Sequence, residues 1–227
     1  LGTLPFPPYL RGVTSGSEIG EGSYLAAMSK SVKKENKPVI LVTNDDGINA
    51  PGIRALVDAV RGLGKIIVVA PDKPQSGMGH AITIGQLLRL QKVNVFEGIE
   101  AYSCSGTPVD CVKIAVDKVL HRKPDLCISG INHGSNHSIN VIYSGTMSAA
   151  LEASIESIPS IGFSLTDLSI DADFTAAGKY ARIIVEKLLS GKSLDKHLCL
   201  NVNIPAVSEK LIKGIKICRQ AYAKYQE

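Results

Sequence analysis

From Pro38 onward, short apolar runs alternate with segments of helical periodicity, and this alternation limits the fold more than any other feature. Helices are expected to begin near Ala50 and Thr107, to follow Thr146, and to cover Phe174–Leu189. Strands are expected over Val39–Thr43, Lys65–Ala70, Leu87–Val95, Ala101–Cys104, Asp125–Ser129, Ser160–Leu165, Leu198–Ile204 and Ile215–Cys218. This order predicts an α/β, Rossmann-like fold, with a doubly wound, mainly parallel sheet and helices on both faces. The third and fourth strands are expected to form a small β-hairpin extension.

Two helices carry local signals in the sequence. Thr107 is expected to be an N-cap, with Pro108 in the first helical position and Asp110 in the third. The helix after Thr146, which Thr146 is expected to cap, should bury one stripe of side chains. The stripe consists of Met147, Ala150, Leu151, Ser154, Ile155 and Ile158.

The domain organisation follows from composition along the chain. Residues 1–37 are expected to be a flexible leader or an expression-derived tail, because residues 1–25 hold eight Gly or Pro and Met28 resembles a natural start. Residues 38–227 are expected to form a single α/β domain. The net charge of +4, with no dense basic run, argues against a nucleic-acid polymer as partner.

The sequence also favours a cytoplasmic protein that does not enter a membrane. No apolar run approaches the roughly 20 residues that a membrane span requires. The five Cys include no C-x-x-C pair, so buried reduced thiols are expected in preference to a zinc site.

Right-handed crossovers place the strand-to-helix loops of such a sheet at one edge. The loops at 44–47, 72–79, 105–107 and 130–146 should therefore converge there. In the first loop, Asp45 and Asp46 directly follow a strand. Two adjacent carboxylates repel each other unless a cation or a shared proton relieves them, and a hard divalent cation with a phosphorylated substrate is the simplest relief. The alternative is a plain turn with a helix N-cap, which Asp-Gly also suits.

The other loops offer oxygen ligands and phosphate contacts. Ser76 and Gly77 lie in a small-residue loop that could bring a hydroxyl and backbone N–H groups close to an anion or a metal, or could be a mobile linker. His80 follows and is favoured as a surface residue over a catalytic base. Asn132 and Asn136 carry amides that could complete a metal shell or hold a phosphoryl oxygen.

Two further features bear on the chemistry. His133 and His137 have an i, i+4 spacing, but Gly130 and Gly134 indicate a loop there, which disfavours a zinc site. The run Tyr143-Ser-Gly-Thr146 precedes a helix, where free N–H groups can bind phosphate or Ser144 or Thr146 can simply cap the helix. There is no G-x-S-x-G, Walker A or G-x-G-x-x-G motif. The pattern favours metal-assisted phosphoester hydrolysis.

Five motifs together resemble the SurE-type survival protein phosphatases in order and spacing. They are Thr43-Asn-Asp-Asp-Gly-Ile-Asn-Ala-Pro-Gly52, Ala70-Pro-Asp with Gln75-Ser-Gly77, Ser105-Gly-Thr-Pro-Val-Asp-Cys111, Ser129-Gly-Ile-Asn-His-Gly-Ser-Asn136 and Tyr143-Ser-Gly-Thr-Met-Ser-Ala-Ala-Leu-Glu152. The resemblance covers residues 38–205. It implies a phosphatase of nucleoside 5′- and 3′-monophosphates that depends on one divalent metal ion, Mn²⁺ or Mg²⁺, with short polyphosphate as a further substrate. A homodimer or homotetramer is implied as well.

The resemblance also implies roles for individual residues. The metal is expected on Asp45, Asp46, Ser76 and Asn132. Substrate and phosphate contacts are expected from Asn44, Gly77, Asn136, Ser144, Gly145 and Thr146. Asp45 and Asp46 are the expected catalytic residues, and which of them accepts a proton from water is a hypothesis.

Three departures from the family pattern stand out. Gln75 replaces a frequent arginine, Asn140 occupies a position that is often acidic, and the chain reaches Glu227 without the family's usual C-terminal segment.

A non-catalytic nucleotide-binding or interaction module on the same fold is the alternative function. Two other classes fit less well: a receiver domain would need a phosphoacceptor Asp after its third strand, and a haloacid-type phosphatase would need D-x-D.

Overall fold

The computed structural model describes residues 37–191 and 194–222, and the proposed leader lies almost wholly outside them. Within this range the chain forms a seven-stranded sheet of order β3-β4-β2-β1-β5-β6-β7, in which all neighbours are parallel except β3 and β4. The strands are β1 (Val39–Thr43), β2 (Lys65–Pro71), β3 (Leu90–Val93), β4 (Glu100–Cys104), β5 (Leu126–His133), β6 (Ser160–Leu165) and β7 (Cys199–Ile204). The expected α/β fold is confirmed, and the expected hairpin is the β3–β4 edge of the main sheet.

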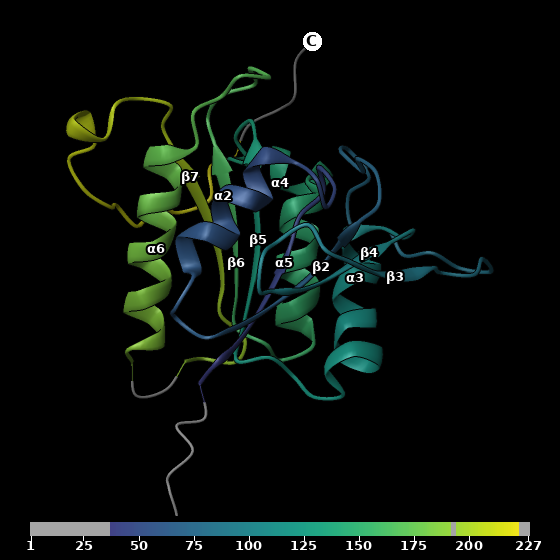
Figure 1. The fold of residues 1–227 in the computed structure, drawn as a ribbon. Helices are drawn as coiled ribbons and strands as arrows, with labels where there is room; N and C mark the ends of the chain where they lie inside the picture. Colours follow the sequence, from purple (N-terminus) through teal and green to yellow (C-terminus); the bar gives the residue numbers. More distant parts are fainter. Residues whose placement is uncertain (1–36, 192–193, 223–227) are drawn as a thin grey trace, which may run out of the picture. The chain divides into compact units, whose positions relative to one another are not determined.

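Helices cover both faces of this sheet (Figure 1). One core joins α2 (Pro51–Val60) and α6 (Thr175–Leu189) to sheet residues such as Ile40 and Val42. The other joins α3 (Pro108–Ile114) and α5 (Gly145–Ile155) to residues such as Leu41. All five residues of β1 are buried and four of them are apolar, as is typical of a central parallel strand that is covered on both faces.

The strand order reverses at β1, which pairs with β2 on one side and β5 on the other. In open α/β sheets the crevice outside the carboxyl ends of the strands at such a switch point is where ligands bind. A glycine brings the helix after β1 close to β5: a Cβ on Gly52 would lie 1.9 Å from the carbonyl oxygen of Ile131. The start of α2 therefore packs against β5, and the carboxyl ends of β1 and β5, which pair with each other, lie side by side.

The structure confirms the expected start of α3. Asp110 N–H donates to Thr107 Oγ1 at 3.2 Å, and Thr107 N–H donates to Asp110 Oδ2 at 2.9 Å. Asp110 also accepts hydrogen bonds from the backbone and hydroxyl of Thr83. The capping box thus anchors the long loop between β2 and β3 as well as the helix. Past Ile114 the helix continues as a π-helix (Ala115–Leu120).

Other expectations about the elements were wrong. The strand expected to end at Ser129 continues to His133, so only the first four residues of the loop expected from Gly130 are strand. Gly130, at φ 124°, allows a bulge after which Asn132 pairs again with Ser164 of β6. The strand expected over Leu87–Val95 is confined to β3. The strand expected over Ile215–Cys218 is absent, since its alternating apolar residues have no neighbouring strand among the described residues and Ile217 is 97% exposed.

Helix α5 buries a different face from the stripe that its periodicity predicts. Met147, Ala150 and Ile158 are buried as expected, but Leu151 and Ile155 are exposed. The buried face instead includes small residues, Ala149 and Ala153, which let α5 pack closely against the sheet and α3. Ser144, not Thr146, is the N-cap, and it accepts a hydrogen bond from Met147 N–H at 3.0 Å.

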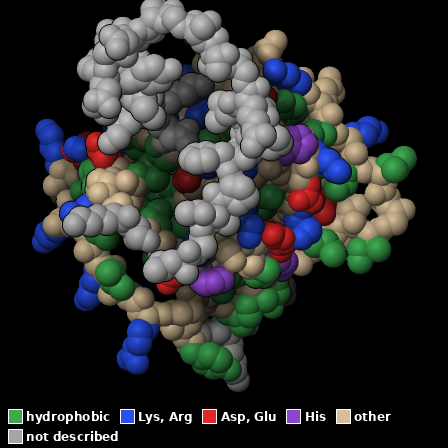
Figure 2. All heavy atoms as spheres, turned by 90° about the horizontal axis from the view of Figure 1, so that it is seen from below, with side chains coloured by type: hydrophobic (Ala, Val, Ile, Leu, Met, Phe, Trp, Pro, Cys, Tyr) green, Lys and Arg blue, Asp and Glu red, His purple; other side chains and the backbone are tan. Residues whose placement is uncertain are grey.

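Two surface properties bear on the expected partners. At the right of the face seen in Figure 2, Asp and Glu side chains lie among Lys and Arg side chains. Within residues 37–191 and 194–222, none of the helices has the length and apolarity needed to cross a bilayer.

The double role of Asp110 leads to a stability prediction. Asp110→Ala removes a buried acceptor for the N-cap of α3 and for Thr83, and is expected to lower the free energy of unfolding by about 2–4 kcal/mol. Urea denaturation followed by circular dichroism measures the change. Asp117→Ala, at an exposed position of the same helical region, is the control, with an expected change within about 0.5 kcal/mol. Equal effects of the two substitutions would contradict the anchoring role.

Candidate active site

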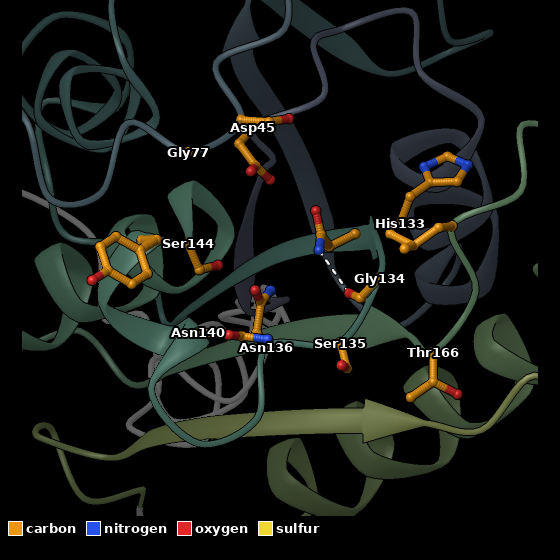
Figure 3. A pocket seen from close by; sticks show the side chains of 13 residues that line it. Asp45, Gly77, His133, Gly134, Ser135, Asn136, Asn140, Ser144 and Thr166 are labelled. Atoms are coloured by element: carbon orange, nitrogen blue, oxygen red, sulfur yellow. Dashed lines mark hydrogen bonds between the residues drawn. The ribbon is translucent and has the colours of Figure 1, made fainter. Parts of the chain in front are cut away.

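A cavity of about 650 Å³ opens at the carboxyl edge of the sheet (Figure 3). Loops after β1, β2, β5 and β6 contribute to it, and the sequence predicted the first three. The loop at 105–107 was also expected here, but none of its residues lines the cavity. Its lining residues are Asp45, Ser76, Gly77, Asn132, His133, Gly134, Ser135, Asn136, Asn140, Tyr143, Ser144, Thr166 and Leu168. Six of the expected site residues are thus brought together around one cavity that lies at the topological switch point.

Asp45 is the most perturbed carboxyl group of the site. Only 3% of its surface is exposed, and burial, followed by the charge of Asp46, raises the pKa of Asp45 to about 6. Hydrogen bonds from the hydroxyl and the backbone of Thr146 act in the opposite direction. Gly145 permits this approach, because a Cβ there would lie 2.6 Å from the Asp45 Cβ. Asp45 is therefore packed into the N-terminal turn of α5, where the helix dipole favours a negative charge.

Asp46 lies beside Asp45 in a more open position. Its side chain is 19% exposed. Ser76 Oγ lies 3.5 Å from Asp46 Oδ1, and His133 Nδ1 lies 3.4 Å from Asp46 Oδ2. His133 packs edge-on against the ring of Phe174. Both contacts are long for hydrogen bonds, so the Asp46 oxygens remain accessible to a further ligand.

Asn136 lies across the cavity from Asp45 (Figure 3), and Asn132 lines the same cavity. Asn132 ends the bulged part of β5, and its amide NH₂ donates to Gly134 O at 2.8 Å, which leaves the amide oxygen as its ligand atom. Asn136 is 5% exposed, and its side-chain amide donates to Ser164 Oγ at 2.8 Å. Ser144, in the turn before α5, completes this set of polar groups.

Asp46 and three of the expected substrate residues, Asn44, Gly145 and Thr146, do not line the cavity. Asn44 is buried and donates to Gly47 O at 2.9 Å, which shapes the turn that carries the two aspartates. Gly145 and Thr146 are buried against Asp45. Their contacts orient the Asp45 carboxylate, so in this structure they act on the site through Asp45.

The structure places the remaining residues of interest as follows. Asn140 lines the cavity, whereas Gln75 lies outside it and donates its backbone N–H to Asp45 O at 2.7 Å. His80 pairs with Glu152 at 2.8 Å and does not line the cavity. Sequence reasoning missed Thr166, although its place directly after a predicted strand at the same sheet edge was a usable signal.

The donor set decides what the site can hold. Among the described residues there is no cluster of three or more His, Cys, Asp or Glu suited to a metal ion, so a site built from side chains of those types alone is not present there. Carboxylates of Asp45 and Asp46, the hydroxyl of Ser76 and the amide of Asn132 are all oxygen donors. Mg²⁺ and Mn²⁺ prefer such ligands, and usually take one or two carboxylates with substrate and water completing the shell.

Comparisons with known proteins agree with this arrangement. The family model described as "Survival protein SurE" matches residues 40–227. A protein named 5'-nucleotidase SurE from Christiangramia forsetii is 62% identical over 195 residues, which is 85% of this chain and 75% of that protein. A protein of the same name from Flavobacterium johnsoniae is also 62% identical over 195 residues, covering 86% of this chain and 75% of that one.

A solved structure gives the same result for the fold. The crystal structure of the SurE protein from Aquifex aeolicus has a TM-score of 0.73 and 40% sequence identity, over 82% of this chain and 73% of that one. The five motifs, the seven-stranded sheet and these matches lead to one conclusion: the chain belongs to the SurE survival protein family.

Proposed function

We propose that this protein is a 5′-nucleotidase, which hydrolyses nucleoside 5′-monophosphates, and to some extent 3′-monophosphates, to nucleoside and inorganic phosphate. Relatives that are 45–62% identical carry the name 5'-nucleotidase SurE. The observation that carries the proposal is that Asp45, which is buried beside the more open Asp46, lines one cavity together with Asn136 and Ser144. A volume of about 650 Å³ is within the range of roughly 300–1,000 Å³ that is usual for small-molecule sites.

We propose Asp45, Asp46, Ser76 and Asn132 as the residues that hold one divalent cation, Mn²⁺ or Mg²⁺. The electrostatic state of Asp45 supports this, because a carboxylate that is buried beside another carboxylate gains most from a neighbouring cation. When bound, such a cation polarises a phosphoryl oxygen and lowers the pKa of water at the site.

The protein's own groups would carry out the remaining steps. Asp46 is our candidate for accepting a proton from the attacking water, because its oxygens are open while Thr146 occupies an oxygen of Asp45. Ser144, Asn136 and the backbone of Gly77 would face the phosphate and stabilise the negative charge that develops on its equatorial oxygens.

Two further parts of the proposal concern the state of the protein. We propose a cytoplasmic enzyme, which the free thiols of all five cysteines support. We also propose a homodimer or homotetramer, as the family resemblance implies. Nucleoside monophosphates are the proposed partners.

The proposed function predicts metal-dependent turnover. The protein should release phosphate from a panel of nucleoside 5′-monophosphates with Mn²⁺ or Mg²⁺, should lose this activity in EDTA, and should regain it when the metal is restored. Phosphate release measured by a colorimetric assay checks this. A protein that binds nucleotides but shows no turnover with either metal would instead be the non-catalytic module.

The role of Asp46 is tested in the same assay. Asp46→Asn is expected to lower kcat about 10²–10⁴-fold, because the proposed proton acceptor is lost. Asp58→Asn, on the exposed face of α2, is the matched control and should retain normal activity. Full activity of Asp46→Asn with Mn²⁺ still bound would exclude Asp46 as the proton acceptor.

The burial of Asp45 predicts that its ionised carboxylate lowers the free energy of unfolding of the metal-free protein. The unfolded chain loses this proton near pH 4, whereas the folded, metal-free protein keeps it until about pH 6, so the carboxyl group costs stability as pH rises from 4 to 6 and at every higher pH. The cost corresponds to about 3 kcal/mol. Asp45→Asn, which keeps an acceptor for Thr146, is therefore expected to be more stable than the natural protein in EDTA at pH 8, and nearly equal at pH 4.

Urea denaturation in EDTA between pH 4 and pH 8 measures this difference. Asp171→Asn, at an exposed position, is the control and should change stability equally little at every pH. If Asp45→Asn is less stable than the natural protein at pH 8, Asp45 is not held at an electrostatic cost.

A further inference from the structure

Two asparagines on β7 hold the backbone of Asn136 although neither lines the cavity. Asn203 Oδ1 accepts a hydrogen bond from Asn136 N–H at 2.8 Å, and Asn201 Nδ2 donates to Asn136 O at 2.7 Å. Asn203 Nδ2 also donates to Asn201 Oδ1 at 2.9 Å. The two side chains are two positions apart on a strand, so they project from the same face of the sheet. They form a closed amide clamp around both polar groups of a single residue.

Local preference alone does not fix the shape of the segment that the clamp holds, since this segment includes a costly backbone conformation at Ser138. Gly134 has φ 87° and Ser138 has φ 53°, and positive φ at a residue other than glycine is costly. Between them, the Asn136 side chain is bonded to Ser164 of β6. The clamp and this bond fix the middle of the segment relative to the sheet. Its ends are held by the bonds from Gly134 N–H to Asp167 O, at 2.8 Å, from Asn132 Nδ2 to Gly134 O and from Ser138 Oγ to Ala221 O.

We propose that Asn201 and Asn203 are positioning residues, which set the affinity of the site for phosphate by fixing the segment 134–138 as one wall of the cavity. This inference rests on the proposed function, in which Asn136 faces the phosphate. Asp45, one of the proposed metal residues, follows a different strand, β1, and lies across the cavity from Asn136 (Figure 3). Loss of the clamp should therefore weaken phosphate binding while metal binding is maintained.

The test compares Asn201→Ala, Asn203→Ala and the double variant with the natural protein. Each single variant is expected to raise KM for a nucleoside 5′-monophosphate and the inhibition constant of inorganic phosphate about 10-fold, with kcat and the Mn²⁺ dissociation constant changed no more than about 2-fold. The double variant should lose little more than either single variant, because both side chains act on the same segment. Asn94→Ala, exposed in the β3–β4 connection, is the control and should leave all four constants unchanged.

A second measurement separates the clamp from general destabilisation and from the proposed function. Amide hydrogen exchange by NMR should be faster at Asn136 in Asn203→Ala, while the amide of Val42 in the central strand stays protected. Binding of inorganic phosphate, titrated in the presence of Mg²⁺, should weaken about 10-fold in the same variant. Both readouts remain valid if the natural protein shows no turnover, an outcome that would overturn the proposed function alone. Unchanged phosphate affinity with a rapidly exchanging Asn136 amide, or a parallel loss of Mn²⁺ and phosphate affinity, would overturn the positioning role.

Discussion

The carboxyl group of Asp45 is the feature on which the arrangement of this site depends. It is almost fully buried at the end of β1, beside Asp46, and its pKa is raised to about 6. The start of α5 can approach this carboxyl group closely, because Gly145 has no Cβ to collide with it. Thr146 donates a hydrogen bond to it. The N-terminal turn of α5 therefore packs against Asp45, and this contact brings the start of α5 and the end of β1 together beside the cavity.

The sheet topology explains why the other polar groups gather around this carboxylate. The order reverses at β1, so the ends of β1 and β5 are neighbours, and the bulge at Gly130 carries β5 onward to Asn132 and His133. The loop after β2 brings Ser76 within 3.5 Å of Asp46. The amide clamp of β7 then fixes the far wall through Asn136. β1, β2 and β5 thus lead into the lining of a single cavity, and β7 supports that lining from outside.

Local sequence patterns predict much of this fold. The strand Val39–Thr43 has the expected bounds, and the Thr107–Asp110 capping box was predictable because its signals lie within four residues. The errors came from tertiary context. The apolar period of α5 predicted Leu151 and Ile155 as buried, but the close packing of small alanines determined which face turns inward. The strand expected at Ile215 lacked a partner strand, which no local pattern reveals.

In the candidate site, too, some features were predictable from the sequence and others depend on tertiary contacts. The convergence of three of the four expected loops was predictable from right-handed crossovers, and Asp45, Ser76, Asn132, Asn136 and Ser144 do line one cavity. The burial of Thr146 against Asp45 was not predictable, because it depends on the distance between two elements that are about a hundred residues apart. The same holds for the contact of His133 with Asp46, and for the link between β7 and Asn136.

The central claim is that the Asp45–Asp46 pair exists to hold a divalent cation. A crystal structure of the full chain grown with Mn²⁺ at neutral pH, with anomalous diffraction data collected at the manganese edge, tests this most directly. The account predicts one anomalous peak in the cavity, bonded to carboxylate oxygens of both Asp45 and Asp46 at roughly 2.0–2.3 Å. A structure with saturating Mn²⁺ in which the peak lies elsewhere, or in which the two carboxylates bind no ion, would contradict it.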